Sequence, residues 1–302
     1  MSFQIIVFFF CICYAGVRLY RSFIINNFSA VVKTREEGAL IANGAGGIFW
    51  DVFLIFCLYL WLYHKVHPKL LVVFLCPSLF FTIMGWLDDL NDLTAHVKLI
   101  SQTAIACISV IIYNVVMNWH FSLLGMAIQV FLLVWIVNAV NFIDILDGLS
   151  SSISLLIFIS LFIIFKKSQI LYLELIAGFW IIASLVFFIQ NIRKPDVYLG
   201  DAGAHLFGTM MFFMSCEYYS NILADKSKSF LPIIVVFSFL VFDFLYVCGR
   251  RWFKKQSIMK KSKDHLALVL SEKTASVGKT VLFMSFFQFC ASFLAIWIFL
   301  YY

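Results

Sequence analysis

Four polar side chains recur at every third position in one otherwise apolar stretch of the sequence. The four are Asn138, Asn141, Asp144 and Asp147. On a helix of about 3.6 residues per turn, each step of three falls back by roughly 60°, so the four would spread over about half of the circumference. Because residues 131–137 are entirely apolar, we expect a membrane-type helix that delivers two amides and two carboxylates at its end. Gly148 is the predicted helix stop.

A pair of neighbouring aspartates, Asp88 and Asp89, ends another apolar run. Adjacent carboxylates on a helix point in different directions, so one can face a metal and the other a substrate. Two like charges side by side raise one pKa, and a hard cation such as Mg²⁺ relieves this repulsion. A solvated interfacial carboxylate run is the alternative interpretation.

Asp201 lies between two glycines, Gly200 and Gly203, directly before a further apolar run. The glycines allow the backbone to approach a ligand or to enter a turn with positive φ. The amides at the start of the following helix could then face a phosphate. A tight turn without a ligand uses the same residues.

His265 follows a basic stretch that covers residues 250–263. A histidine among lysines is typical of a solvated surface, and basic loops beside a membrane often contact anionic lipid headgroups. Together with the carboxylates, the same stretch would suit a pyrophosphate, whose charge its cations would offset. The combination fits phosphoryl transfer from a soluble, diphosphate-activated donor to a lipid acceptor.

The elements that must position these residues are membrane helices. Of the 302 residues, 63% are hydrophobic and only 13% are charged, with a mean hydropathy of +0.99. This composition predicts an all-α polytopic membrane protein that forms one transmembrane domain over residues 1–302. The eight cysteines lie in or beside apolar runs without a CxxC pair, so we expect them to be buried apolar side chains. The ten predicted spans cover residues 3–20, 46–63, 70–87, 99–117, 121–140, 152–165, 170–190, 204–219, 230–247 and 281–301.

The distribution of lysine and arginine predicts the orientation of these spans. Ten spans place sixteen of the 22 basic residues on one side, which is therefore the expected cytoplasmic side, with both termini outside. All three acidic clusters fall on this side. The predicted cytoplasmic loops cover about residues 21–45, 88–98, 141–151, 191–203 and 249–280.

These motifs resemble the polyprenyl-phosphate N-acetylhexosamine-1-phosphate transferases, which form glycosyltransferase family 4. This family includes the phospho-MurNAc-pentapeptide translocases and GlcNAc-1-phosphate transferases. Asp88-Asp89 matches its paired aspartates, residues 138–149 match its NxxNxxDGxDGL motif, and residues 198–204 match its aromatic-x-GDxGS motif. The resemblance covers about residues 46–265, and the family has the same ten-helix topology.

The resemblance implies a role for each matched residue. Asp201 would be the main Mg²⁺ ligand, with Mn²⁺ as an alternative ion and Asp89 in support, and Asp88 would bind or deprotonate the lipid phosphate. Tyr198 would stack on uracil, and His265 would contact the diphosphate or the sugar. The residues implied to hold the nucleotide-sugar donor are Asn138, Asn141, Asp144 and Asp147.

The implied reaction transfers a sugar phosphate from a UDP-N-acetylhexosamine to undecaprenyl phosphate and releases UMP. It would start the synthesis of a cell-surface glycan such as O-antigen or teichoic acid, from a multi-pass protein of the bacterial inner membrane. The expected partners are the UDP-sugar, undecaprenyl phosphate and the bilayer, without nucleic acid, and a homodimer is left open.

The sequence also departs from the family pattern. Ile145 replaces a glycine, Ala204 replaces the serine of GDxGS, and residues 43–47 lack the usual proline, arginine and histidine. His265 stands alone where the pentapeptide translocases carry three histidines, so the pattern disfavours that substrate.

Two other classes of membrane protein remain as alternatives. An intramembrane aspartyl protease would place its aspartates inside the spans with a GxGD motif, and only Asp243 is a candidate of that type. A non-enzymatic transporter would line the middle of the membrane with polar residues, for which Asp51 and Asp243 are too few.

Overall fold

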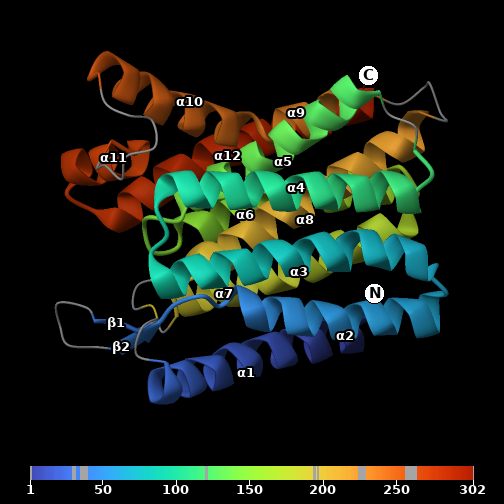
Figure 1. Ribbon diagram of the computed structural model, residues 1–302, viewed down its shortest axis with the longest axis horizontal. Helices are drawn as coiled ribbons and strands as arrows, with labels where there is room; N and C mark the ends of the chain where they lie inside the picture. The colour runs from blue at the N-terminus through green and yellow to red at the C-terminus, as the bar shows by residue number, and fades with distance from the viewer. Residues whose placement is uncertain are drawn as a thin grey trace. The chain divides into compact units, whose positions relative to one another are not determined.

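The computed structural model of the chain describes residues 2–28, 32–34, 40–119, 122–192, 195, 197–223, 229–255 and 264–301. These residues form mainly helices, with one short hairpin (Figure 1). In chain order the elements are α1 (Phe3–Asn27), β1 (Val32–Thr34), β2 (Leu40–Ala42), α2 (Gly46–His64), α3 (Pro68–Asn91), α4 (Ala95–Val116), α5 (Leu123–Ile143), α6 (Leu149–Lys167), α7 (Leu171–Asn191), α8 (Gly200–Leu223), α9 (Leu231–Val236), α10 (Ser238–Phe253), α11 (Leu266–Thr274) and α12 (Val277–Tyr301). Some basic residues used for the orientation lie outside the described residues, namely Arg35, Arg193, Lys194, Lys226, Lys228, Lys260, Lys261 and Lys263.

Within the described ranges, eight helices are long and apolar enough to cross a membrane, namely α1 to α7 and α12. The prediction of an all-α polytopic membrane protein is therefore confirmed. The eighth predicted span coincides with α8, whose polar side chains Asp201, His205 and Glu217 lower its hydropathy. The ninth is divided into α9 and α10 at Phe237. The side chain of Gln288 donates a hydrogen bond to the Val236 carbonyl at 3.0 Å beside this division.

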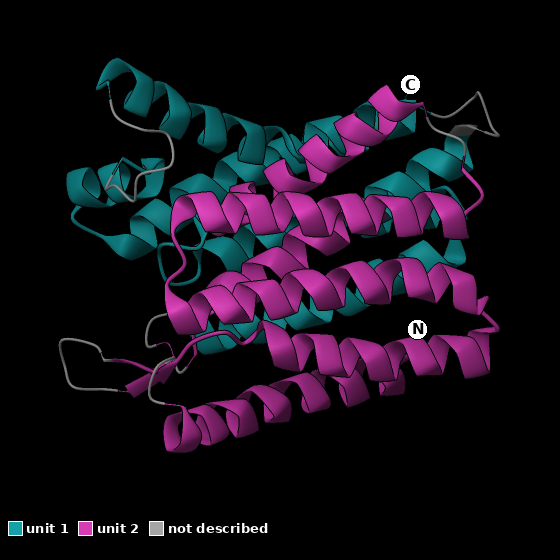
Figure 2. Cartoon of the chain, in the orientation of Figure 1, with its two compact units in different colours: residues 1, 142–194, 214–302 teal, residues 2–141, 195–213 magenta. Residues whose placement is uncertain are grey.

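The described chain divides into two compact units (Figure 2). Unit 2 contains residues 2–141 and 195–213, and unit 1 contains residues 142–194 and 214–302. The single transmembrane domain expected from the sequence stays a prediction.

In unit 2, helices that follow one another in the chain pack side by side from α1 to α4 (Figure 1). The first half of α8 packs against α3 and α5, where two glycines allow the backbones to approach closely. A Cβ atom on Gly85 of α3 would lie 2.5 Å from the Asp201 backbone, and one on Gly208 of α8 would lie 2.7 Å from Val137 of α5. Close packing of this kind fixes the position of the Asp201 backbone.

The segment before α8 is held by the hairpin of unit 2. β1 and β2 are antiparallel, with Val32 opposite Ala42. The Tyr198 N–H donates to the Ala42 carbonyl at 2.9 Å, and the Tyr198 carbonyl accepts from the Ala45 N–H at 3.3 Å. Gly200 then adopts φ +68°, a conformation that L side chains rarely adopt. The chain can therefore turn directly from this segment into α8.

Unit 1 is built around α6, which packs against α7 and α12. The rings of Phe158 and Trp180 stack between α6 and α7 with centroids 5.9 Å apart. The hydroxyl groups of Ser152 and Ser285 join α6 to α12 at 2.9 Å. Both contacts join long apolar helices of unit 1.

Candidate active site

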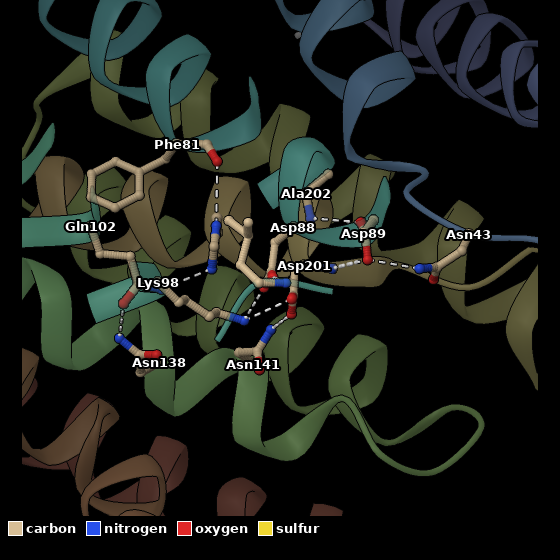
Figure 3. Close-up of polar contacts among 12 residues, drawn as sticks. Asn43, Phe81, Asp88, Asp89, Lys98, Gln102, Asn138, Asn141, Asp201 and Ala202 are labelled. Atoms are coloured by element: carbon tan, nitrogen blue, oxygen red, sulfur yellow. Dashed lines mark hydrogen bonds and ion pairs between the residues drawn. The ribbon is translucent and has the colours of Figure 1, made fainter. Parts of the chain in front are cut away.

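A lysine and two aspartates form the centre of a polar cluster in unit 2 (Figure 3). Lys98 Nζ lies 2.7 Å from Asp88 Oδ2 and 2.6 Å from Asp201 Oδ2. Asp88 ends α3, Lys98 lies in the first turn of α4, and Asp201 lies in the first turn of α8. The Asp88 side chain is 6% exposed and that of Asp201 is 23% exposed, so this ammonium neutralises carboxylates with limited access to water.

Asp88 and Asp89 diverge, as the sequence predicts for adjacent carboxylates. Asp88 Oδ1 accepts from the Leu93 N–H at 2.9 Å, which closes the turn after α3, while its other oxygen faces Lys98. Asp89 faces the start of α8 instead: Oδ1 accepts from the Asp201 N–H at 3.1 Å and Oδ2 accepts from the Ala202 N–H at 3.2 Å.

Asp89 therefore caps the N-terminus of α8. The first N–H groups of a helix have no partner within it, and a carboxylate there also interacts favourably with the helix dipole. Asn43 Nδ2 adds a third hydrogen bond to Asp89 Oδ1 at 2.7 Å. Both oxygens of Asp89 are thus used to hold the backbone next to Asp201.

The first half of the asparagine-rich stretch belongs to the same cluster. Asn141 Nδ2 donates to Asp201 Oδ1. One turn earlier on α5, Asn138 Nδ2 donates to Gln102 Oε1 of α4 at 2.7 Å. The structure thus brings together Asp88, Asp89, Asn138, Asn141 and Asp201, five of the residues predicted from the sequence.

The second half of this stretch differs from the prediction. The helix ends at Ile143, so Asp144 and Asp147 lie in a turn rather than on a helix face, and Gly148 with φ +83° directly precedes α6. These residues belong to unit 1. There Asp144 Oδ1 accepts from the Ser150 hydroxyl at 2.5 Å, and the Gly148 N–H donates to Asn191 Oδ1 at 2.6 Å. These side-chain hydrogen bonds stabilise the turn in place of a further helical turn.

His265 also lies in unit 1, where it is the N-cap residue of α11 and only 9% exposed. The solvated-surface interpretation is therefore wrong. Arg251 Nη2 lies 3.5 Å from His265 Nε2, and the Phe142 ring lies edge-on at 5.3 Å. Burial, together with the positive charge of Arg251, lowers the pKa of His265 to about 4. Its imidazole is then neutral at pH 7, so the cationic group of this pair is Arg251.

Tyr198, the residue expected to stack on uracil, belongs to unit 2. The Lys33 ammonium lies 5.6 Å from the centroid of its ring, within the range of a cation–π interaction. The ring is partly exposed. Stacking on a base stays a prediction.

Sequence reasoning missed Lys98, Gln102, His205 and Asn43 as members of the cluster. Gln102 and His205 are polar residues inside apolar runs, which is a signal of function or of a buried polar network. Lys98 lies ten residues after Asp88 at the start of the next span, so its proximity could have been inferred from the short connection. Asn43 carries no comparable signal.

A divalent cation has to be compared with the cation already present, the Lys98 ammonium. Among the described residues, no group of three or more His, Cys, Asp or Glu side chains has the arrangement of a metal site. The donor chemistry nevertheless fits, since carboxylate oxygens are what Mg²⁺ prefers. Lys98 places a positive charge between Asp88 and Asp201, which shows where these carboxylates would hold a cation.

A polytopic helical membrane protein, with aspartates, a lysine and amides gathered at helix ends, is the class that this fold and this cluster define. The family described as Glycosyl transferase family 4 matches residues 71–219, just under half of the chain. The matched residues include every member of the cluster except Asn43, and they end before His265.

Two curated relatives show how far the similarity extends. An undecaprenyl-phosphate alpha-N-acetylglucosaminyl 1-phosphate transferase of Thermotoga maritima is 28% identical over 208 residues, 68% of this chain and 63% of the relative. A phospho-N-acetylmuramoyl-pentapeptide-transferase of Lactococcus lactis subsp. cremoris is 27% identical over 209 residues, 61% of each chain. The chain thus spans about three-fifths of the length of these relatives, whose names specify different sugar phosphates.

Proposed function

We propose that the protein transfers an N-acetylhexosamine-1-phosphate group from a UDP-sugar to undecaprenyl phosphate. A lipid phosphate oxygen would attack the phosphorus that carries the sugar, the bond from this phosphorus to the bridging oxygen would break, and UMP would leave with that oxygen. The single observation that carries the proposal is the contact of Lys98 with both Asp88 and Asp201. The match of residues 71–219 to Glycosyl transferase family 4 supports the same reaction class.

In this proposal each residue of the cluster has a defined task. Asp88 faces the lipid phosphate and can take up a proton from it. Lys98 offsets negative charge on the phosphate oxygens while the sugar phosphate passes from the UDP-sugar to the lipid. This is a form of preorganised electrostatic stabilisation. Asn141 orients Asp201 through its hydrogen bond to Oδ1, and Asp89 holds the backbone of Asp201 and Ala202.

Asp201 is the residue that would hold Mg²⁺, or Mn²⁺ as an alternative. The ion would supply a Lewis acid that neutralises phosphate charge. Because Asp89 is occupied at the α8 N-terminus, we assign it to the support of Asp201 and not to direct ligation. Asp144, Asp147, Tyr198 and His265 are proposed to contact the donor.

The proposed setting is the bacterial inner membrane, with ten crossings, both termini outside and the cluster facing the cytosol. This orientation rests on the lysine and arginine distribution. The product would be a lipid-linked sugar for a cell-surface glycan. The intramembrane protease interpretation would need Asp243, which lies in unit 1 and outside the matched residues.

The experiment is a donor panel. Purified protein in detergent, with undecaprenyl phosphate and Mg²⁺, is incubated with UDP-N-acetylhexosamines, and UMP and lipid-linked sugar are both measured. We expect equal amounts of the two products with at least one donor, and loss of both with Asp201→Asn. A folded, monodisperse protein that forms neither product with any donor would overturn the proposal.

A further inference from the structure

A chain of hydrogen bonds inside unit 2 runs from α3 through α8 and α4 to α5 (Figure 3). His205 Nδ1 lies 3.3 Å from the Phe81 carbonyl oxygen, and His205 Nε2 lies 3.0 Å from Gln102 Nε2. Gln102 Oε1 accepts from Asn138 Nδ2 at 2.7 Å. His205 and Gln102 are both fully buried, at 0% exposure. Buried polar groups of this kind are costly unless they are satisfied, so the directions of these bonds are constrained.

Two backbone carbonyls fix the direction of every bond. The Phe81 carbonyl can only accept, so His205 Nδ1 must carry the proton that it donates. At the other end Asn138 Nδ2 also donates to the Val134 carbonyl at 2.8 Å, which identifies the nitrogen of that amide. Gln102 therefore turns its oxygen towards Asn138 and its nitrogen towards His205. Nε2 of His205 must then be unprotonated and accept this bond.

The directions of these bonds determine which atom of the Asn138 amide stays available to a ligand. Both contacts of its amide group within the chain use Nδ2, so among the described residues Oδ1 is the atom left without a hydrogen-bond partner. Asn138 is partly exposed and lies one helical turn before Asn141, whose amide contacts Asp201. Asn138 thus presents a hydrogen-bond acceptor one helical turn from the amide that contacts Asp201, whereas a flipped amide would present a donor there.

We infer that His205 is a positioning residue that sets Asn138 as an obligate acceptor for a hydroxyl or N–H group of the nucleotide-sugar donor. This inference rests on the proposed function, and it assigns to Asn138 a partner that donates a hydrogen bond rather than a phosphate oxygen. His205 acts through Gln102 and touches no substrate atom. His205 lies outside both matched motifs, at residues 138–149 and 198–204.

The kinetic test uses His205→Leu, His205→Gln and the same changes in a Gln102→Leu background. Glutamine can still offer an oxygen to Gln102, whereas leucine cannot. His205→Leu should lower kcat/KM for the UDP-sugar about tenfold, equal to about 1.4 kcal/mol, through a higher KM for that donor. The KM for undecaprenyl phosphate should stay unchanged, and His205→Gln should remain within about threefold of the wild type. With Gln102→Leu already present, His205→Leu should have no further effect, because the two residues act in one chain.

The structural test does not depend on activity. Solid-state NMR of the ¹⁵N-histidine-labelled full chain in lipid bilayers should show one neutral imidazole with a protonated Nδ1, hydrogen-bonded at Nε2, that disappears in His205→Gln. A protonated Nε2 on His205, or fully additive effects of His205→Leu and Gln102→Leu, would overturn the inference. If the wild type releases no UMP with any donor, the proposed function fails, while the tautomer still decides whether the relay exists.

Discussion

The Lys98 ammonium lies 2.6 Å from the Asp201 carboxylate, at the meeting point of α4 and α8. The two residues are 103 positions apart in the sequence, and neither is fully exposed. A lysine in this position keeps two carboxylates of like charge together, one at the end of α3 and one at the start of α8. It also places a movable positive charge where a phosphate group would enter in the proposed reaction.

Removal of this charge should abolish most of the activity. Lys98→Met should lower UMP release by about 100-fold or more, in the range found when one electrostatic stabiliser of a transition state is lost. Lys98→Arg should retain part of the rate, because it keeps the charge but changes its reach. The control is Lys279→Met, which changes an exposed lysine of unit 1 without a described ion pair. Equal rates for Lys98→Met and Lys279→Met would rule out the assigned task.

Substitution of the two neighbouring aspartates should have different effects, mainly on stability for Asp89 and mainly on turnover for Asp88. Asp89→Asn places an amide nitrogen against helix N–H groups and removes a charge from the α8 N-terminus, so it should lower the stability by about 1–2 kcal/mol. Asp88→Asn keeps an acceptor for the Leu93 N–H and should reduce turnover with a smaller loss of stability. Thermal unfolding in detergent and UMP release, measured on both variants, separate the two effects. A larger drop in melting temperature for Asp88→Asn would contradict the capping role of Asp89.

The backbone conformation at position 200 requires a glycine. At φ +68° an alanine costs about 1–2 kcal/mol, and its Cβ would lie 2.5 Å from Asp89 Oδ2. We therefore expect Gly200→Ala to lower the melting temperature and to displace the cap of α8. Gly47→Ala is the matched control, since a Cβ there meets no atom within 4 Å. The assigned conformation would be wrong if both variants unfolded at the wild-type temperature.

His265 should make the protein sensitive to acid. Its pKa is lowered to about 4 in the folded chain from an ordinary value of 6.5. Above pH 6.5 both folded and unfolded forms carry a neutral imidazole. As the pH falls from 6.5 to 4, the unfolded form gains a proton that the folded form excludes, so stability is lost across this window. His265→Gln should reduce that loss between pH 7 and pH 4. Parallel curves for the two proteins would contradict the buried, neutral state.

Part of the site followed from the sequence for simple physical reasons. The alternation of the spans, together with the lysine and arginine count, places all three acidic clusters at the same membrane face, which is why Asp88, Asn141 and Asp201 are predicted to meet. Hydropathy does not report local hydrogen bonds, so it could not show that α5 ends at Ile143 and leaves Asp144 in a turn.

The same limit applies to the fold. The division of the ninth span at Phe237 occurs where Gln288, a residue about fifty positions later, satisfies a backbone carbonyl. The burial of His265 and the partners of Gln102 and His205 likewise depend on tertiary packing. A sequence window contains none of these contacts.

A comparison of Asp201→Asn with Asp243→Asn in one assay decides whether the cluster around Asp201 performs the transfer. Asp243 is also buried, at 2% exposure, but belongs to unit 1 and takes no part in the proposed chemistry. With undecaprenyl phosphate, Mg²⁺ and the best UDP-sugar of the panel, mass spectrometry of the lipid fraction should detect undecaprenyl-diphosphate-sugar with the wild type and Asp243→Asn, and none with Asp201→Asn. Undiminished product from a correctly folded Asp201→Asn protein would show that this cluster does not perform the transfer.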